Sequence, residues 1–370
     1  MSLEILIERF IAKARNESSG FAVWYLPGSN IPMAVVQQEG EAEHISDLSQ
    51  LHDRSGFVMA PFVVSKQNPV LLLSPKGLLQ GEDEIVRYVG DFSGSFDFTN
   101  NSSDENFVET PKEEFISQCS NAIELIRKGE IDKVVLSRQK FVKRREDIPP
   151  GSLLQLLKSK YPDAFVCLFY TSVTGWWMGA TPELLLRGHA DEYQTMALAG
   201  TRAHSAQTPF SPWPEKEQLE QKFVTDYIIE KLVSNDANDI HCAAPFTRTA
   251  GAIEHICTEI SFKSGNAGKL LQALHPTPAV CGMPADIAKD YILKTEKHNR
   301  AYYSGFLGML NINGQTDVYV NLRCMKLLGE GNLLYAGAGI TAGSDPEKEW
   351  HETEMKMASM GRALNDFKNK

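Results

Sequence analysis

The chain has 370 residues and a formal charge of −10, with 42% hydrophobic and 23% charged residues. This length accommodates one large domain or two ordinary ones, and the residue balance is that of a globular protein with a sizeable core. The acidic charge argues against nucleic acid or an anionic membrane surface as a partner, because both repel it.

The first part of the chain predicts a helix followed by short strands. Residues 1–20 mix acidic, basic and apolar residues, which is typical of an amphipathic helix rather than a signal peptide. GFAVWYLPG and GFVMAPFVVS then predict strands. Residues 91–110 are rich in Ser, Asn and Asp and predict a surface loop. We therefore divide the chain into an N-terminal α+β portion, residues 1–105, and a main region, residues 106–370.

Neither a membrane anchor nor a cysteine framework is predicted. No apolar run is long enough to cross a bilayer. The six cysteines form no CxxC pair, so most are expected to be small buried side chains in a reducing compartment. The expected location is the cytoplasm.

The main region opens with a helix signal. Thr110 is the expected N-cap, Pro111 the first helical residue and Glu113 the acidic residue three positions after the cap. The helix is expected to end at Gly129. DKVVLSRQKFVKR then predicts a strand, SLLQLLKSKY a short helix and AFVCLFYT a further strand.

The remaining elements alternate hairpins with helices. Residues 176–202 predict strands joined by a turn at 188–192. The next segment, PEKEQLEQKFVTDYIIEKLVSN, predicts a long helix. Its expected buried residues are Leu219, Phe223, Tyr227 and Ile228.

The last third of the chain continues this pattern. AIEHICTEISFK predicts a strand, PADIAKDYILKTEKHN a helix, and DVYVNLRCMKLLGEGNLLYAGAGIT a hairpin that turns at residues 329–332. The closing helix is expected to begin at Asp345 as its cap. Because strands occur in hairpins rather than in βαβ units, we predict an α+β fold with large, mostly antiparallel sheets that carry helices on one face.

Two of the predicted helices each carry a pair of glutamates three residues apart. Glu349 and Glu352 share one face of the closing helix with Lys356, and Glu217 and Glu220 have the same spacing on the long helix. A solvated face explains either pair alone. Two helices that each offer two carboxylates can instead build an oxygen-rich site, which suits Mg²⁺.

Two ionisable residues lie at the ends of apolar strands. Lys133 begins DKVVLSR, where it is either an edge lysine that shields the strand or a partly buried base. Glu183 precedes three leucines in GATPELLLRG. It is either a carboxylate at the entry of a hairpin or a carboxyl kept protonated by its surroundings, which can serve as a general acid.

Two further residues have both structural and functional interpretations. Arg323, in VYVNLRCM, either forms a structural ion pair or captures a substrate carboxylate with its guanidinium fork. His255 lies in a predicted strand, where a satisfied core histidine is the plainer interpretation and a donor to substrate the alternative.

Taken in order, the motifs DKVVLSR, GATPELLL, LAGTR, KEQLE, RAYYSGFLG, VNLR, AGAGI and DPEKEWHETEMK resemble those of the chorismate-utilising enzymes. That family includes isochorismate synthase, salicylate synthase, anthranilate synthase component I and aminodeoxychorismate synthase component I. The resemblance covers about residues 110–370 and implies the chorismate-binding α+β fold.

The resemblance also implies a set of site residues. Glu220 and Glu352 would chiefly hold Mg²⁺, with support from Glu217 and Glu349. Arg323, Tyr303 and Lys356 would hold substrate carboxylates. The remaining expected lining residues are Gly200, Thr201, His255, Gly337 and Gly339. The family usually has His after the second helix-borne Glu, whereas this chain has Gln221.

Two positions distinguish members of the family. Lys133 resembles the lysine of isochorismate and salicylate synthases, where it activates water, and anthranilate synthases usually carry Gln there. Ala199 stands where aminodeoxychorismate enzymes usually have a nucleophilic lysine. The resemblance therefore implies addition of water at C2 of chorismate and loss of the C4 hydroxyl, with Lys133 as base and Glu183 as acid.

Three alternatives stay open at this point. Salicylate synthase adds pyruvate elimination in the same site. A non-catalytic chorismate-binding relative would be expected to lack Lys133 or Glu183, and both are present. A structural metal-binding role would not explain the pairing of Lys133 and Glu183 on separate strands. The expected partner is the substrate chorismate, and no amidotransferase subunit is expected. The protein is expected to be a monomer or weak homodimer that acts in menaquinone or siderophore synthesis.

Overall fold

A computed structural model describes residues 1–94, 107–144, 148–203, 212–250 and 253–366. Most of the predicted loop near residues 91–110 lies outside these ranges. None of the helices in these ranges has the length and hydropathy needed to span a membrane.

The described residues form eight α-helices and two short 3-10 helices. The α-helices are α1 (Leu3–Glu17), α2 (Glu82–Val89), α3 (Lys112–Arg127), α4 (Pro150–Lys160), α5 (Glu215–Val233), α6 (Ala267–Leu274), α7 (Ala285–Thr295) and α8 (Pro346–Asp366). The 3-10 helices are η1 (Leu48–Leu51) and η2 (Pro75–Gly77).

The strands of the described residues fall into two sheets. They are β1 (Gly20–Tyr25), β2 (Met33–Val36), β3 (Glu43–Ile45), β4 (Gly56–Ala60), β5 (Val70–Leu73), β6 (Leu78–Gln80), β7 (Lys133–Lys143), β8 (Phe165–Thr171), β9 (Gly175–Thr181), β10 (Leu184–His189), β11 (Glu192–Ala203), β12 (Asn238–Cys242), β13 (Phe246–Ala250), β14 (Ile253–Lys263), β15 (Gly282–Met283), β16 (Phe306–Ile312), β17 (Gln315–Val320), β18 (Cys324–Leu327) and β19 (Gly331–Ile340).

Every strand pairing in the described residues is antiparallel. The first sheet has the order β15-β7-β19-β18-β9-β8-β1-β2-β6, and the second has the order β12-β14-β11-β10-β17-β16-β4-β5-β3, with β13 beside β14. The α+β class with large antiparallel sheets is therefore confirmed. Strands from the first 105 residues join both sheets, and the division near residue 105 stays a prediction.

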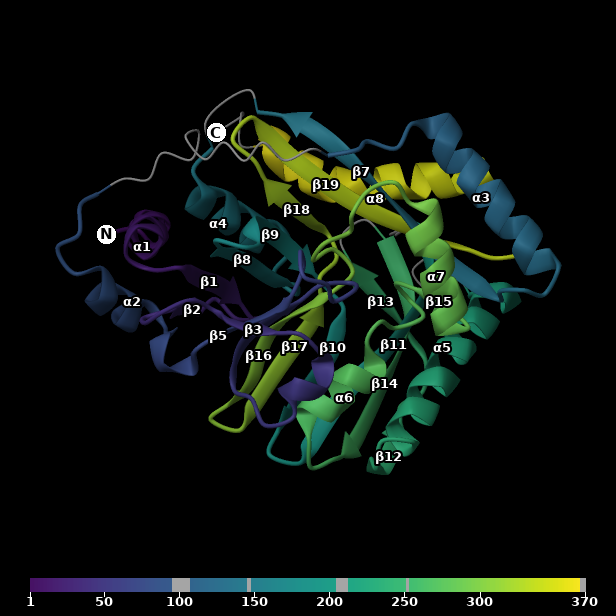
Figure 1. Cartoon of the computed structure of the whole chain (residues 1–370), viewed down its shortest axis with the longest axis horizontal. Coiled ribbons are helices and arrows are strands. Elements are labelled where there is room, and N and C mark those ends of the chain that lie inside the picture. Colours follow the sequence, from purple (N-terminus) through teal and green to yellow (C-terminus); the bar gives the residue numbers. More distant parts are fainter. Residues whose placement is uncertain (95–106, 145–147, 204–211, 251–252, 367–370) are drawn as a thin grey trace.

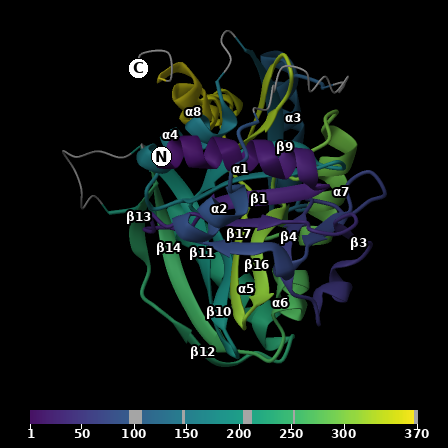
Figure 2. The ribbon, with the colours of Figure 1, turned by 90° about the vertical axis from the view of Figure 1, so that its left-hand side faces the viewer.

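The two sheets pack against each other, and helices cover their outer faces (Figures 1 and 2). In β8, Phe165, Cys167 and Phe169 enter the core between the sheets, whereas Val166 and Leu168 face α1 and α4 on the other side. Both faces of such a strand are buried, which explains its unbroken apolar run. Helices α5 and α6 cover the second sheet in the same way.

Two local predictions are wrong. Helix α3 begins at Lys112 with Pro111 as its N-cap, because the carbonyl of Pro111 accepts the first helical bond, from the N–H of Phe115. Thr110 lies buried one residue too early to cap it. The predicted hairpin from residue 317 to 341 exists only as β18 and β19, since β17 belongs to the second sheet.

The predicted buried face of α5 is also partly wrong. Leu219 and Phe223 are 48% and 57% exposed, whereas Val224 and Ile228 are buried. Gln221 lies on the buried face, and its side chain donates a hydrogen bond to the Thr258 hydroxyl on β14 at 2.6 Å. The buried stripe of α5 thus combines apolar residues with a polar contact to the sheet.

Candidate active site

A cavity of about 300 Å³ is enclosed by strands of both sheets and by helices α5 and α8. Its lining includes the following predicted residues: Lys133, Glu183, Gly200, Glu217, Glu220, His255, Tyr303, Arg323, Gly337, Gly339, Glu349, Glu352 and Lys356. Thr201 belongs to β11, but its side chain lies outside the described residues. The fold therefore brings together residues that are up to 223 positions apart in the sequence, from 133 to 356.

Lys133 is the first residue of β7 and is only 8% exposed. Its Nζ donates to Glu220 Oε1 on α5 at 2.5 Å. A lysine that shields a strand edge would be solvated, so that interpretation of Lys133 is wrong. The side chain instead enters the cavity from one sheet and meets a carboxylate from a helix that covers the other sheet.

The glutamate and lysine stripe of α8 faces the cavity and not the solvent. Lys356 Nζ lies 2.6 Å from Glu352 Oε1 and donates to the Gly337 carbonyl on β19 at 2.9 Å. Burial alone would raise the pKa of Glu352, but the charge of Lys356 outweighs it and holds this pKa below its ordinary value. Asp345 accepts hydrogen bonds from the first-turn amides of α8, which confirms the predicted cap.

Glu183 lies in the connection between β9 in the first sheet and β10 in the second. Its carbonyl accepts a hydrogen bond from Val320 N at 3.0 Å, which anchors this connection to β17. Burial raises the pKa of Glu183 to about 7, against the opposing charges of Lys356, Lys133 and Arg323. A carboxyl with this pKa can carry a transferable proton near neutral pH.

Arg323 lies where the chain crosses from β17 to β18 and has a left-handed backbone, with φ of +47°. Backbone strain of this kind in a residue other than glycine often marks a functional position. Burial lowers the pKa of its guanidinium. The side-chain amide of Asn321, two residues before Arg323, donates to the Tyr302 carbonyl at 2.9 Å and so holds this connection against the segment that carries Tyr303.

Tyr303 is buried and stacks on Tyr335, with 5.3 Å between the ring centroids. Burial raises the pKa of its phenol, so the hydroxyl keeps its proton and can donate it in a hydrogen bond. A side chain at Gly337 would meet that hydroxyl at 3.1 Å from its Cβ. Gly337 thus leaves room for the phenol at the wall of the cavity.

His255 on β14 is neutral, because burial lowers its pKa to about 4. Its Nδ1 lies 2.8 Å from the Gly200 carbonyl. Gly200 lies at a bulge in β11, since the pairing with β14 shifts between Ala199 and Arg202. Gly200 has φ of +69°, which favours glycine, and a Cβ there would lie 3.2 Å from that of Glu217.

The four predicted glutamates offer carboxylate oxygens, which are the donors that a hard divalent cation takes. Glu217, Glu220, Glu349 and Glu352 all line the cavity, and Glu217 Oε2 is buried with no hydrogen-bond partner among the described residues. An orphaned carboxylate oxygen is costly unless a cation or water satisfies it. No three His, Cys, Asp or Glu side chains in the described parts of the chain are already gathered as metal ligands.

Several lining residues were missed by the sequence analysis, including Val280, Ser304, Tyr335 and Lys348. Lys348 precedes Glu352 by four residues, so its helical spacing could have revealed it. The others have no sequence signal, because neutral residues acquire a role only through the neighbours that the fold supplies.

The sequence matches known proteins over most of its length. A family model described as "Chorismate binding enzyme" matches residues 52–365. The salicylate biosynthesis isochorismate synthase of Pseudomonas aeruginosa is 34% identical over 262 residues, which are 67% of this chain and 54% of the relative. The isochorismate synthase MenF of Escherichia coli is 32% identical over 254 residues, 66% of this chain and 58% of the relative. These alignments span little more than half the length of either relative.

Solved structures show the same fold. The menaquinone-specific isochorismate synthase MenF of Escherichia coli superposes with a TM-score of 0.77 and 22% identity, covering 96% of this chain and 90% of the other. The putative 2,3-dihydroxybenzoate-specific isochorismate synthase DhbC of Bacillus anthracis gives 0.76 and 25%, covering 97% and 99%. Anthranilate synthase component I of Streptococcus pneumoniae gives 0.68 and 18%, covering 92% and 89%.

Proposed function

This chain belongs to the chorismate-binding enzymes, and from that premise we propose that it is an isochorismate synthase, which converts chorismate into isochorismate. The observation that carries the proposal is the meeting of Lys133 and Glu183 in one cavity, each at most 8% exposed and each from a different segment. A buried amine and a buried carboxyl with a pKa of about 7 supply the base and the acid that exchange of a hydroxyl group requires.

Cationic groups and one phenol are proposed to hold the substrate. Chorismate carries two carboxylates, and Arg323 and Lys356 line the cavity as cations. Arg323 with Tyr303 is assigned to the pyruvyl carboxylate, because a guanidinium fork and a phenol can both donate to it. Lys356 is assigned to the ring side of the cavity. His255, Gly200, Thr201, Gly337 and Gly339 complete the proposed lining.

Glu220 and Glu352, supported by Glu217 and Glu349, are proposed to hold Mg²⁺. When bound, the cation neutralises the ring carboxylate and polarises the conjugated diene. The orphaned oxygen of Glu217 supports this assignment. Each of the two principal carboxylates contacts a lysine in this structure: Glu220 contacts Lys133, and Glu352 contacts Lys356. A cation at these carboxylates would compete with both lysines.

The proposed reaction exchanges one hydroxyl for another. Lys133 takes a proton from water, whose oxygen forms a bond to C2. The two ring double bonds shift, and the bond from C4 to its hydroxyl breaks. Glu183 gives that hydroxyl its proton, so that it leaves as water. An ammonium cannot accept a proton, so the reaction requires Lys133 to release Glu220 and lose its own proton first.

The test is to incubate the protein with chorismate and Mg²⁺ and identify the product by chromatography and mass spectrometry. Isochorismate is the expected product. Salicylate with pyruvate would replace the assignment by salicylate synthase, and unchanged chorismate would reject both. We further propose that the protein acts in the cytoplasm as a monomer or weak homodimer, without an amidotransferase subunit, in menaquinone or siderophore synthesis.

A further inference from the structure

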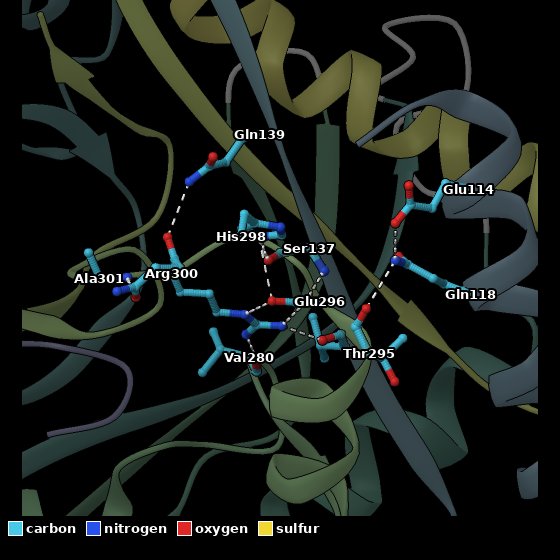
Figure 3. Close-up of polar contacts among 12 residues, drawn as sticks. Glu114, Gln118, Ser137, Gln139, Val280, Thr295, Glu296, His298, Arg300 and Ala301 are labelled. Carbon is cyan, nitrogen blue, oxygen red and sulfur yellow. Dashed lines mark hydrogen bonds and ion pairs between the residues drawn. The ribbon is translucent and has the colours of Figure 1, made fainter. Parts of the chain in front are cut away.

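Behind one wall of the cavity lies a buried ion pair to which the proposed reaction assigns no role. Arg300 and Glu296 each have side chains only 3% exposed. Figure 3 shows their ion pair and its neighbours. Arg300 Nε donates to Glu296 Oε2 at 2.8 Å, and Arg300 Nη2 donates to Oε1 at 2.6 Å. Burial would raise the pKa of Glu296, but the charge of Arg300 outweighs it, and this pKa is below its ordinary value.

The pair uses its remaining hydrogen-bonding capacity on backbone groups of the cavity wall. Arg300 donates to the Val135 carbonyl at 2.7 Å and to the Val280 carbonyl at 2.9 Å. Glu296 Oε1 accepts from the backbone N–H of Ser137 at 2.6 Å. Val135 and Val280 both line the catalytic cavity, so one salt bridge connects two of its segments.

These contacts continue a β-ladder with side chains. The short strand β15 pairs with β7 only at Lys133 and Val134. Beyond that point the pair bonds Val135 and Ser137, which are two residues apart and therefore present their backbone groups to the same edge of β7. The backbone N–H of Val135 still donates to the Cys281 carbonyl at 2.8 Å. Glu296 and Arg300 thus take the place of a neighbouring strand from the Val135 carbonyl onward, two residues after Lys133.

The same segment also carries a substrate-binding residue. The backbone N–H of Tyr303 donates to the Arg300 carbonyl at 2.9 Å. His298 adds a further contact between this segment and β7, because its Nε2 lies 2.9 Å from Ser137 Oγ. The ion pair therefore lies at the junction of three segments, which bear Lys133, Val280 and Tyr303.

We propose that Glu296 and Arg300 are positioning residues, which hold the start of β7 so that Lys133 faces the reacting carbon. This role rests on the proposed function, because it concerns the base of that reaction. Their contribution acts through backbone carbonyls and one amide, without contact with substrate. Displacement of a catalytic group by about 1 Å can cost roughly a hundredfold in rate, so a small shift of β7 has a large effect.

The test compares Glu296→Gln and Arg300→Lys with a control at another ion pair. Glu296→Gln removes the charge that Arg300 requires, and Arg300→Lys cannot reach both carbonyls and the carboxylate with one ammonium. The control is Arg187→Lys, which alters the contact between Arg187 and Asp317 at 2.7 Å in the second sheet. Neither of those two residues lines the cavity. Circular dichroism and thermal unfolding show whether each variant is folded at the assay temperature.

In the folded variants at the ion pair, kcat is expected to fall by about tenfold or more. KM for chorismate should stay within about threefold, because Arg323 and Lys356 reside on other elements and Tyr303 is held through the backbone carbonyl of Arg300, which these substitutions retain. The control is expected to lose thermal stability while its kcat stays near the wild-type value. This difference separates a positioning role from a structural one.

A second variant keeps the proposal testable by rescue. A cavity of about 230 Å³ borders both Glu296 and Arg300 and shares no lining residue with the catalytic cavity. In Arg300→Ala, added methylguanidine is expected to restore part of kcat, whereas methylammonium, which lacks the planar fork, should not.

Three outcomes would overturn the positioning role. These are a wild-type kcat in the folded variants, an effect on KM alone, or loss of the whole fold at the assay temperature in every variant of the pair. If the wild-type protein itself leaves chorismate unchanged, the proposed function fails and the role in that reaction fails with it. An active wild-type enzyme with fully active variants rejects the positioning role alone.

Discussion

In the proposed reaction, Lys133 as base and Glu183 as acid have opposite protonation requirements within one cavity. A base must be neutral to take a proton, whereas an acid must hold one to give it. Burial supplies the proton on Glu183 by raising its pKa to about 7. Lys133 instead donates to Glu220 at 2.5 Å. Lys133 can therefore act as the base only when it no longer donates to Glu220, which is a proposed ligand of the cation.

Removing Lys133 or Glu183 should lower turnover strongly while chorismate still binds. Lys133→Ala and Glu183→Gln are each expected to lower kcat by about 10²–10⁴-fold, the range that general acid or base catalysis supplies. Both should still bind chorismate, measured by calorimetry, because Arg323 and Tyr303 remain. Both should also be inactive with isochorismate, since the reverse reaction uses the same groups. Turnover within about threefold of wild type would refute the role of that residue.

The raised pKa of Glu183 also predicts how stability depends on pH. The folded protein binds this proton more tightly than the unfolded chain, since the pKa of about 7 exceeds the ordinary value of 4.5. The resulting stability is present in full below about pH 4.5 and is lost as the pH rises to about 7. Glu183→Gln removes this dependence.

Urea unfolding of the wild type and Glu183→Gln at pH 4.5 and pH 8 measures the effect. The free energy of unfolding of the wild type, relative to the variant, should decrease by about 3 kcal/mol between these pH values. A difference that is independent of pH would show that the carboxyl titrates normally.

Two helices that pack on different sheets supply the carboxylates of the cavity. Helix α5 covers the second sheet, and α8 packs on β19 of the first. Each helix buries part of its charged stripe against the cavity, which explains why neither stripe behaves as a solvated surface. The metal assignment therefore requires both helices to keep their rotation and position.

We predict dependence on a divalent cation through this pair of helices. Glu352→Gln should remove most activity and lower the calorimetric affinity for Mg²⁺ at least about tenfold while leaving the fold intact, because a metal-bound carboxylate is replaced by a neutral amide. Glu347→Gln is the control on the same helix, since Glu347 is exposed and does not line the cavity. Full activity in excess chelator would contradict this prediction.

The rotation of α5 yields a stability prediction. Ile228 is buried, so Ile228→Ala should lower the free energy of unfolding by about 2–5 kcal/mol. Phe223 is 57% exposed, so Phe223→Gln should change it by no more than about 0.5 kcal/mol. Chemical denaturation of both variants is the measurement. A larger loss for Phe223→Gln would indicate that this side chain is covered in solution.

At the scale of the whole molecule, the catalytic cavity exists only because two sheets and two helices converge. Glu183 and Arg323 lie in connections that cross from one sheet to the other, and Lys133 begins a strand of the first sheet. Ala199 lies beside them with a side chain that cannot act as a nucleophile. The proposed reaction therefore uses Lys133 as a base for an external nucleophile, since the side chain at position 199 offers no covalent alternative.

We predict that water, and not ammonia, is that nucleophile. Neither ammonium nor glutamine should serve as a nitrogen source, because Lys133 occupies the position of the base and Ala199 provides no amine. Incubation with chorismate, Mg²⁺ and ammonium, followed by detection of aminated products, is the measurement. Efficient formation of anthranilate or aminodeoxychorismate would reject water addition.

The sequence by itself determined the fold class, the order of most elements and the charged residues that line the cavity, apart from Lys348. Hairpin spacing and apolar periodicity are local properties, so α1, α8 and β7 could be predicted from their own residues. The roles of the site residues were predicted from the resemblance to a family, which rests on the order of short motifs along the chain. The family match over residues 52–365 agrees with that identification.

The tertiary structure alone decided which of two competing patterns is buried and which distant groups meet. The buried face of α5 includes Gln221, whose partner Thr258 lies on another element. The assignment of β17 to the second sheet depends on pairing with β10 and β16, which no local pattern encodes. The ladder that Glu296 and Arg300 build on β7 arises in the same way, because a buried charge acquires its role from the backbone groups that the fold places around it.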